Sequence, residues 1–281
     1  MSRVVIAGPA SWNRIVYLDA LPEPRPHMQF AEEYYDTVGG TSAGKALHLA
    51  SLGHDVHLHT MLGDDDDGRR VGSLLADAGI DLHAIPADIT ERHLNLMTRA
   101  GERVSLYLET PHPVTSTAAP DFATADAVVL DLGAVSAGLL DTAAASGTPV
   151  WVDLHDYDGV SAYHDPFIGV ADAVFMSDGG LEDPRPLMLR LIEGGASLVV
   201  CTLGAAGAIA CDADGTFHSA AALPVEVRDT NGAGDAFLSG FLDAHLRAAP
   251  LTECLAAGAR QARTALTTRH LHPALDDALG A

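Results

Sequence analysis

The chain has 281 residues, of which 48% are hydrophobic, so one large domain can bury a sizeable core. The formal net charge is −22, from 16 Lys and Arg against 38 Asp and Glu, and such a field repels nucleic acid and anionic membrane surfaces. No run approaches the roughly 20 apolar residues of a membrane helix, and the N-terminus lacks a cleavable signal pattern. The three cysteines lack metal-ligand spacing. We therefore expect a cytoplasmic protein with reduced thiols that binds a small molecule, not nucleic acid or a membrane.

Short apolar runs alternate with segments of helical period along most of the chain. The runs with the character of buried strands are residues 4–7, 56–62, 127–132, 150–154, 173–176 and 198–203. Between the first two, Ala43, Ala46, Leu47 and Ala50 recur at helical spacing. The alternation predicts an α/β fold in a single domain, residues 1–281, with a mostly parallel central sheet flanked by helices. Ligands of such sheets bind beyond the carboxyl ends of the strands.

Two regions depart from this alternation, at about residues 27–38 and 91–110. Both are typical of antiparallel strands and predict a small sheet projecting from the main one. As a lid, that sheet would exclude water from a reacting phosphate. An ordinary edge hairpin is the alternative, and periodicity does not separate the two. The Pro-rich residues 21–26 are expected to form a loop after the first strand.

The most informative segment is residues 229–237, DTNGAGDAF, in which a glycine-rich turn leads directly into a helical pattern. Free N–H groups of Gly232, Ala233 and Gly234 would converge at the helix N-terminus, where the helix dipole adds positive potential. This arrangement suits the charge on a phosphoryl group in transfer. Asp235, in the first turn, could take the proton of an acceptor hydroxyl. A purely structural helix cap is the alternative explanation.

The DTNGAGDAF string resembles the C-terminal motif of the ribokinase family (PfkB-type carbohydrate kinases), whose usual form is DTxGAGDxF. Other segments are similar to that family in order and spacing. They are residues 5–10, Gly39-Gly40 with the helical residues 43–53, Gly63-Asp64 with Gly68, and the TLGAAG string at residues 202–207. The resemblance covers residues 3–270.

The resemblance implies a ribokinase-like fold with a β lid, and transfer of the γ-phosphoryl group of ATP to a hydroxyl with Mg²⁺. It places the general base at Asp235 and a monovalent-cation site, for K⁺, at Asp229 and Asn231. The other implied positions are an anion hole at Gly232, Ala233 and Gly234, a nucleotide loop at Thr202, Gly204 and Gly207, and a substrate side at Asn13, Gly39, Gly40 and Gly44. A homodimer formed through the lid is left open.

The substrate side departs from the family pattern in three places. Asn13 stands where the family has an Asp just past the first strand, and Gly44, followed by Lys45, replaces the Asn of the KGAN segment. Gly133 stands where ribokinase has a Glu, with Asp131 two residues earlier. Because the phosphoryl-transfer motif is intact, these changes favour the same chemistry on an acceptor other than ribose.

The NxxE motif that organises Mg²⁺ in the family is replaced by SDGGLE at residues 177–182. Asp178 or Glu182 could substitute by reaching the ion through water, and the metal site stays open. Residues 64–67 form an acidic run that is expected to cap the following helix.

Several aromatic and histidine residues carry weaker signals. His57 and His59 share a strand face, but no zinc spacing accompanies them, so solvated or hydrogen-bonded histidines are favoured over ligands. His155 follows a strand and could touch substrate. Trp12, Tyr107 and Trp151 could stack on a sugar or a base, although core packing is favoured for each. A nucleoside kinase of the same family and a non-catalytic metabolite sensor are the alternative functions.

Overall fold

A nine-stranded sheet forms the centre of the protein, in a computed structural model that describes residues 1–280. Its strand order is β13-β12-β11-β10-β9-β8-β1-β4-β5. The strands are β1 (Arg3–Ala7), β4 (Asp55–Gly63), β5 (Asp81–Ala87), β8 (Ala127–Asp131), β9 (Val150–Asp153), β10 (Ala173–Ser177), β11 (Leu198–Thr202), β12 (Ala208–Asp212) and β13 (Phe217–Ala220). All neighbours from β11 to β5 pair in parallel, and only β12 and β13 pair antiparallel. The predicted mostly parallel central sheet is confirmed.

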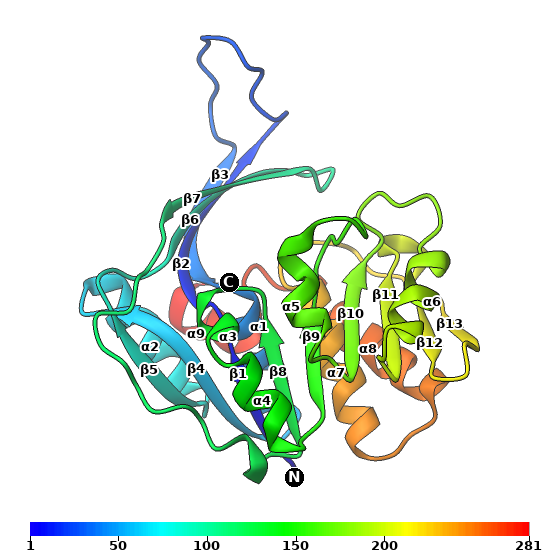
Figure 1. Cartoon of the computed structure of the whole chain (residues 1–281). Coiled ribbons are helices and arrows are strands. Elements are labelled where there is room, and N and C mark those ends of the chain that lie inside the picture. Colours follow the sequence, from blue (N-terminus) through cyan, green and yellow to red (C-terminus); the bar gives the residue numbers. More distant parts are fainter. Residues whose placement is uncertain (281) are drawn as a thin grey trace.

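Helices cover both faces of this sheet (Figure 1). One layer contains α1 (Thr41–Ser51), α2 (Asp66–Asp77), α7 (Ala233–Leu246) and α8 (Leu251–Leu266). The other contains α3 (Ala134–Ala137), α4 (Leu140–Ser146), α5 (Asp165–Ile168) and α6 (Arg185–Glu193), and the short α9 (Asp276–Leu279) ends the described chain. Successive strand residues point to opposite faces, so Val4 and Ile6 pack in the first layer and Val5 and Ala7 in the second. This explains why the central strands carry apolar residues on both of their faces.

A second sheet of four strands rises above the carboxyl ends of the main sheet (Figure 1). Its order is β3-β2-β6-β7, from β2 (Ser11–Leu18), β3 (Glu33–Gly39), β6 (Arg92–Thr98) and β7 (Arg103–Glu109). Strand β2 was not predicted, and residues 27–32 lie outside the strands. Strand β2 begins four residues after β1 ends and runs to Leu18, so the Pro-rich residues 21–26 follow β2. The prediction that they follow the first strand was wrong.

The two faces of the second sheet differ: the outer face carries exposed apolar side chains together with the Arg14–Asp36 ion pair. Its inner face carries polar side chains toward the main sheet, among them Asn13, Thr37 and Asn95. On β7, Val104 and Leu106 alternate with the inward residues and are exposed on the outer face. Because successive residues of a strand point to opposite sides, the inner face of this sheet lines the space between it and the main sheet.

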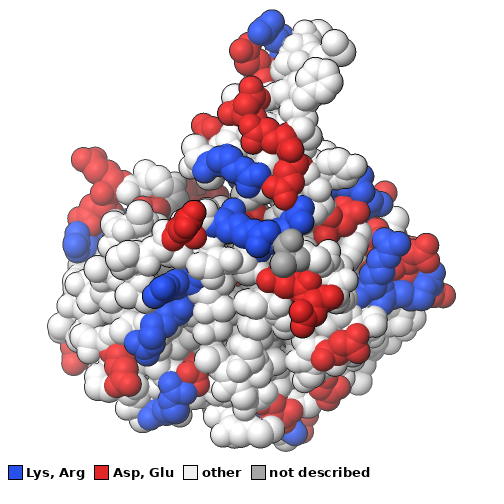
Figure 2. Space-filling view, turned by 180° about the vertical axis from the view of Figure 1, so that it is seen from behind, with Lys and Arg blue, Asp and Glu red and all other residues white. Residues whose placement is uncertain are grey.

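Charged residues on the face seen in Figure 2 are mixed in sign, with Lys and Arg beside Asp and Glu. Arg99 and Arg269 both pair with Glu33, at 2.6 and 2.7 Å. The acidic run predicted to cap a helix does so, because Asp65 is the N-cap of α2 and accepts a hydrogen bond from the Gly68 N–H at 2.7 Å. Within residues 1–280, no helix has both the length and the apolar character needed to cross a membrane.

Candidate active site

A cavity of ≈ 890 Å³ lies between the carboxyl ends of the main strands, the start of α7 and the inner face of the second sheet. Residues at or just after the ends of β1, β8, β9, β10 and β11 line it: Gly8, Gly133, Asp153, Ser177 and Thr202. A cavity at this edge is where parallel α/β sheets bind ligands.

The start of α7 forms one wall of the cavity. Residues 232–235 all line it, and Gly232 precedes the helix in the left-handed conformation, with φ 75°. Among the described residues, no side chain caps this helix end. The N–H groups of the first turn and the helix dipole therefore present positive potential to the cavity, which favours a bound anion.

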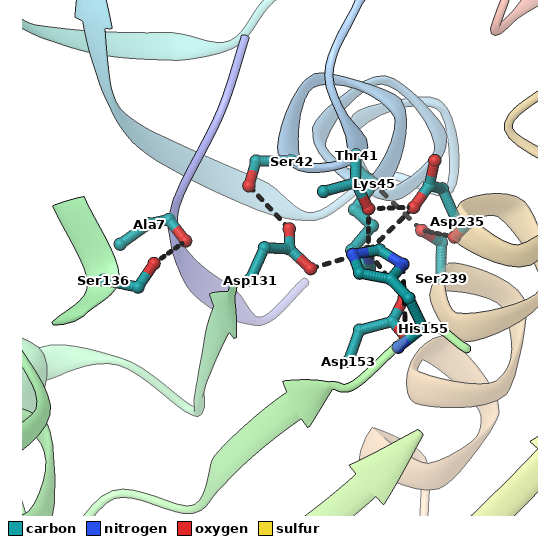
Figure 3. A network of polar contacts seen from close by, with 10 residues as sticks. All are labelled: Ala7, Thr41, Ser42, Lys45, Asp131, Ser136, Asp153, His155, Asp235 and Ser239. Carbon is teal, nitrogen blue, oxygen red and sulfur yellow. Dashed lines mark hydrogen bonds and ion pairs between the residues drawn. The ribbon is translucent and has the colours of Figure 1, made fainter. Parts of the chain in front are cut away.

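Asp235, in the first turn of α7, is held by Lys45 of α1 (Figure 3). The Lys45 Nζ lies 2.7 Å from Asp235 Oδ1, 2.7 Å from Asp131 Oδ1 and 2.9 Å from Asp153 Oδ2. Thr41 also donates a hydrogen bond to Asp235 Oδ1, and Ser42 donates one to Asp131 Oδ2 at 2.5 Å. Residues of α1, β8, β9 and α7, which are far apart in the sequence, thus meet at the fully buried ammonium group of Lys45.

The charges of this cluster depend on one another. Burial opposes the charge of Lys45, but the three carboxylates outweigh it and raise its pKa well above the ordinary lysine value. Burial also works against the Asp153 carboxylate, yet Lys45 and then His155 lower its pKa to about 2. Burial dominates at Asp131 and raises its pKa above the ordinary value, although Lys45 opposes this. Lys45 is therefore a permanent cation, paired with an ionised Asp153.

Gly44 lies where α1 passes closest to Asp235. A Cβ atom at Gly44 would sit 2.9 Å from Asp235 Oδ2, closer than real Cβ contacts allow. The structure therefore gives a steric reason for the glycine that replaces the family's Asn, because the space is used by Asp235. Neither Gly44 nor Lys45 lines the cavity.

Asn13 lies on β2, in the second sheet. The prediction that it follows the first parallel strand at the edge of the main sheet was wrong, because the chain enters β2 at Ser11. Its side chain is 6% exposed, accepts a hydrogen bond from Ser11 Oγ at 2.8 Å and lines the cavity. Gly39 is the small neighbour that makes room for it, since a Cβ there would lie 1.9 Å from Asn13 Nδ2. Gly40 also lines the cavity and has φ 91°.

The predicted nucleotide loop begins at the carboxyl end of β11. Thr202 lines the cavity, whereas Gly204 and Gly207 are not part of its lining. Gly207 has φ 100°, and a Cβ there would lie 2.1 Å from the Ala220 carbonyl oxygen. The backbone of its own turn therefore requires this glycine, independently of any ligand.

The acidic side chains at the cavity differ from those proposed for Mg²⁺ from the sequence. Ser177 lines the cavity, but Asp178 and Glu182 do not. The carboxylates that do line it are Glu91, Asp153, Asp156 and Asp235.

Asp229 joins the loop before α7 to the second sheet. Its Oδ2 accepts hydrogen bonds from the hydroxyls of Tyr17 at 2.7 Å and Tyr35 at 2.6 Å. Its Oδ1 accepts one from the Asn231 N–H at 2.6 Å. Burial and then the Asp229 carboxylate raise the pKa of both tyrosines, so they stay protonated donors. Asn231 lines the cavity and Asp229 does not.

Sequence reasoning missed most of the polar residues on the inner face of the second sheet. His93 and Asn95 of β6 line the cavity, and so does Arg103 of β7. The Asn95 Oδ1 atom is buried without a hydrogen bond in the described part of the chain. The signal was present in the alternation of polar and apolar residues over residues 93–96, HLNL, which places both polar side chains on one face.

The weaker aromatic signals divide between the cavity and the core. Tyr107 and His155 line the cavity, and His155 has an unusual positive φ of 53°. Trp12 and Trp151 are buried in the core beneath the main sheet's first helical layer, as favoured from the sequence.

An open helix N-terminus beside a lysine-held carboxylate, in a cavity at the carboxyl edge of a parallel sheet, is an arrangement suited to phosphoryl transfer. The family model for pfkB family carbohydrate kinases matches residues 1–277, and the chain belongs to this family. It is accordingly an ATP-dependent carbohydrate kinase, and such kinases generally require Mg²⁺.

Known relatives agree with this assignment. The chain is 34% identical over 269 residues to the acarbose 7(IV)-phosphotransferase of an Actinoplanes species, covering 91% of this chain and 89% of that protein. It is 28% identical over 272 residues to the aminoimidazole riboside kinase of Salmonella typhimurium, covering 86% and 80% of the two chains. Among solved structures, a microbiome-derived acarbose kinase superposes with a TM-score of 0.81 at 30% identity, over 95% of this chain and 93% of that one.

Proposed function

We propose that Asp235 is the general base of this kinase and that the turn before α7 holds the phosphoryl group in transfer. The observation that carries the proposal is the position of Asp235 in the first turn of α7, at the cavity wall and beside the open helix end. Lys45 and Thr41 both donate to Oδ1, which within residues 1–280 leaves Oδ2 to accept the proton of an acceptor hydroxyl. Gly232, Ala233 and Gly234 supply the anion hole for the charge that develops on the phosphoryl oxygens.

The acceptor, in this proposal, is a sugar or sugar derivative that lies between Asp235 and the inner face of the second sheet. Asn13, Asn95 and His93 present amide and imidazole groups there, which suits hydroxyls that both donate and accept. Gly39, Gly40 and Gly44 act indirectly, since they give Asn13, the backbone and Asp235 the space they occupy. Acarbose is the first compound to test, because a relative that matches 91% of this chain is named as its phosphotransferase.

A nucleoside acceptor is the second candidate. The exposed ring of Tyr107, at 66% exposure, lines the cavity and could stack on a base. Turnover of acarbose, a monosaccharide panel and a ribonucleoside panel, each coupled to ADP release, would separate the two. No turnover with any acceptor, despite ATP binding, would instead favour a non-catalytic sensor.

The cosubstrate in this proposal is ATP, placed along Thr202, with Gly204 and Gly207 shaping the turn behind it. Mg²⁺ keeps several waters and usually binds phosphates with one or two carboxylates. Asp156 is the carboxylate we assign to the water shell of Mg²⁺, since Asp153 already pairs with Lys45 at 2.9 Å and Glu91 with His93 at 2.8 Å.

A K⁺ site at Asp229 and Asn231 stays a prediction. Both carboxylate oxygens of Asp229 already accept hydrogen bonds, which a bound ion would have to replace or share. A comparison of kinase activity in sodium and in potassium buffers tests the site.

We also infer a homodimer formed through the second sheet and a cytoplasmic location, where ATP is available. The support for the dimer is a group of exposed apolar and aromatic side chains on the outer face of the sheet: Tyr34, Val104, Leu106 and Leu108. A sheet that packs its outer face against a partner could close its inner face over the cavity as a lid.

The test of the base is Asp235→Asn. The amide keeps the shape of the side chain but cannot accept the hydroxyl proton, so we expect kcat to fall by ~10²–10⁴-fold. ATP affinity, measured by calorimetry, should stay within a few-fold of the wild type. A variant with near-normal kcat would show that Asp235 is not the base.

A further inference from the structure

A cluster of histidine and aspartate side chains lies on the edge of the main sheet, away from the cavity. His57 and His59 are on β4, and Asp81 and His83 are their register partners on the edge strand β5. These four side chains share the sheet face on which α4, α5 and α6 cover the strands from β8 onward. None of the four lines the cavity. The cluster therefore has no part in the phosphoryl-transfer site.

Three potential donor atoms of the cluster lie within 3.4 Å of one another. The His57 Nδ1 lies 3.3 Å from His83 Nε2 and 3.0 Å from Asp81 Oδ2, and the His83 Nε2 lies 3.4 Å from the same Asp81 oxygen. A tetrahedral Zn²⁺ ion with bonds of ~2.0–2.1 Å separates its ligand atoms by about 3.3–3.4 Å. The triangle is therefore already close to the size that a tetrahedral ion requires.

The surroundings of His57 provide a second, independent observation. Its other ring nitrogen, Nε2, is buried and makes no aligned hydrogen bond in the described residues, yet it lies 3.3 Å from Asp55 Oδ1. Asp55 is held in turn by Arg3, whose Nε lies 2.8 Å from Oδ2. A carboxylate behind the non-ligating nitrogen is the usual support of a metal-binding histidine, because it fixes the ring and the tautomer.

We propose that His57 Nδ1, His83 Nε2 and Asp81 Oδ2 bind a divalent transition-metal ion, with Zn²⁺ the ion that best matches the ligands. Two imidazoles and one carboxylate suit zinc, whereas Mg²⁺ prefers oxygen ligands in octahedral geometry. Water completes the coordination, and access is open because the side chains of Asp81 and His83 are 56% and 43% exposed. His59 stacks on His83, with ring centroids 4.4 Å apart and planes 5° apart, and so supports that ring from behind.

The bound ion would tie the edge strand β5 to β4. The sequence spacing around His57 and His59 argued against a zinc site. The proposed ligands are far apart in the sequence, since they come from two parallel strands with the whole of α2 between them. Only the pairing of His57 with Asp81 and of His59 with His83 brings them together.

The test uses untagged protein and Co²⁺, whose tetrahedral complexes absorb strongly in the visible range. We expect one Co²⁺ per chain with a tetrahedral visible spectrum, displaced by Zn²⁺, and retained in Asp235→Asn because the site is separate from the cavity. His83→Ala should abolish the spectrum, and Asp55→Asn should weaken Zn²⁺ binding by ~10–100-fold. The matched control is His112→Ala, which removes an exposed histidine outside the cluster and should leave the spectrum unchanged.

Folding is checked separately from metal binding. His83→Ala should keep Mg²⁺-dependent kinase turnover, and Zn²⁺ should raise the Tm of the wild type but not of this variant. A wild-type protein without a tetrahedral Co²⁺ spectrum would overturn the proposal. So would a spectrum that survives in the double variant of His57→Gln and His83→Ala.

Discussion

Lys45 has the most consequential contacts of any single residue in the site. One buried ammonium group pairs with three carboxylates, and one of these is the proposed base Asp235. Burying a charge is costly unless it is paired, so the cluster fixes the position of every member. The sequence indicated only that Lys45 follows Gly44, because its partners Asp131 and Asp235 lie 86 and 190 residues away.

We expect Lys45→Met to lower both stability and kcat. Removing one partner of a buried ion pair typically costs about 3–5 kcal/mol, because the remaining carboxylates lose their counter-charge. Adding Asp131→Asn should recover much of the free energy of unfolding, measured by urea denaturation. It should not recover kcat, because Asp235 would still lack the charged donor Lys45 and keep only Thr41, and KM for ATP should change little. Recovery of both quantities together would show that Lys45 has a structural role only.

At the scale of elements, the strand-length apolar runs located β1, β4, β8, β9, β10 and β11 correctly, because buried parallel strands are rich in apolar residues. The start of α7 was also predicted, since its glycine-rich turn is a local signal. Strand β2 was missed because it is half polar and follows β1 almost directly. The inner-face residues were missed with it, because their convergence depends on the pairing of β2 with β3 and β6.

In the turn between β11 and β12, the sequence and the structure assign different roles to Gly207. Because the family resemblance places Gly207 on the nucleotide loop, the sequence alone predicts that Gly207→Val blocks ATP and spares the fold. The structure instead predicts a loss of stability, because valine would clash with the Ala220 carbonyl and adopt φ 100°. Such strain costs on the order of 1–3 kcal/mol before the clash is counted. Thermal unfolding measures this, with Gly204→Ala as the milder control, since its Cβ would meet nothing within 4 Å in the described chain. A variant with normal Tm and a raised KM for ATP would contradict the structural account.

The second sheet offers an element-scale test of assembly. Leu106→Glu places a charge among the exposed apolar side chains of β7 without touching the inner face, because neighbours on a strand point to opposite sides. We expect the wild type to elute as a dimer in size-exclusion chromatography with light scattering, and the variant as a monomer. Val160→Glu, an exposed apolar residue outside the second sheet, is the matched control. A monomeric wild type would contradict the dimer.

At the scale of the whole molecule, a fall in pH should lower the free energy of unfolding before the many carboxylates take up protons. The shifted carboxylates outside the Lys45 cluster, among them Asp36, Asp65 and Asp158, have lowered pKa values, so their contribution is lost only at strongly acidic pH. Several buried histidines also have lowered pKa values. Because the same histidines take up protons in the unfolded chain at mildly acidic pH, they lower the free energy of unfolding in that range. A fall in stability between pH 6.5 and 5 should therefore come from histidines.

His48 is the histidine on which to measure this effect. Its Nε2 pairs with the Leu271 carbonyl at 2.9 Å and its Nδ1 with the Gln261 amide at 2.8 Å, so a neutral ring with the proton on Nε2 satisfies both. Burial, and then His272, lower its pKa to about 3. The folded ring therefore stays neutral at pH 5, whereas in the unfolded chain, with a pKa of about 6.5, it takes up a proton. The unfolded state gains stability from that proton, so the free energy of unfolding falls as the pH drops below 6.5, by about 2 kcal/mol at pH 5 from this residue.

The expected measurement is a set of urea denaturation curves at pH 8, 6.5 and 5 for the wild type, for His48→Gln and for the exposed control His112→Gln. His48→Gln should lose stability at pH 8, where the neutral imidazole is native, but should show a shallower fall toward pH 5. Acid also reduces the self-repulsion of a chain with a net charge of −22, which stabilises all three proteins alike and cancels in the comparison of slopes. His112→Gln should follow the wild type. Equal slopes for all three proteins would show that His48 is not the group whose protonation drives acid unfolding.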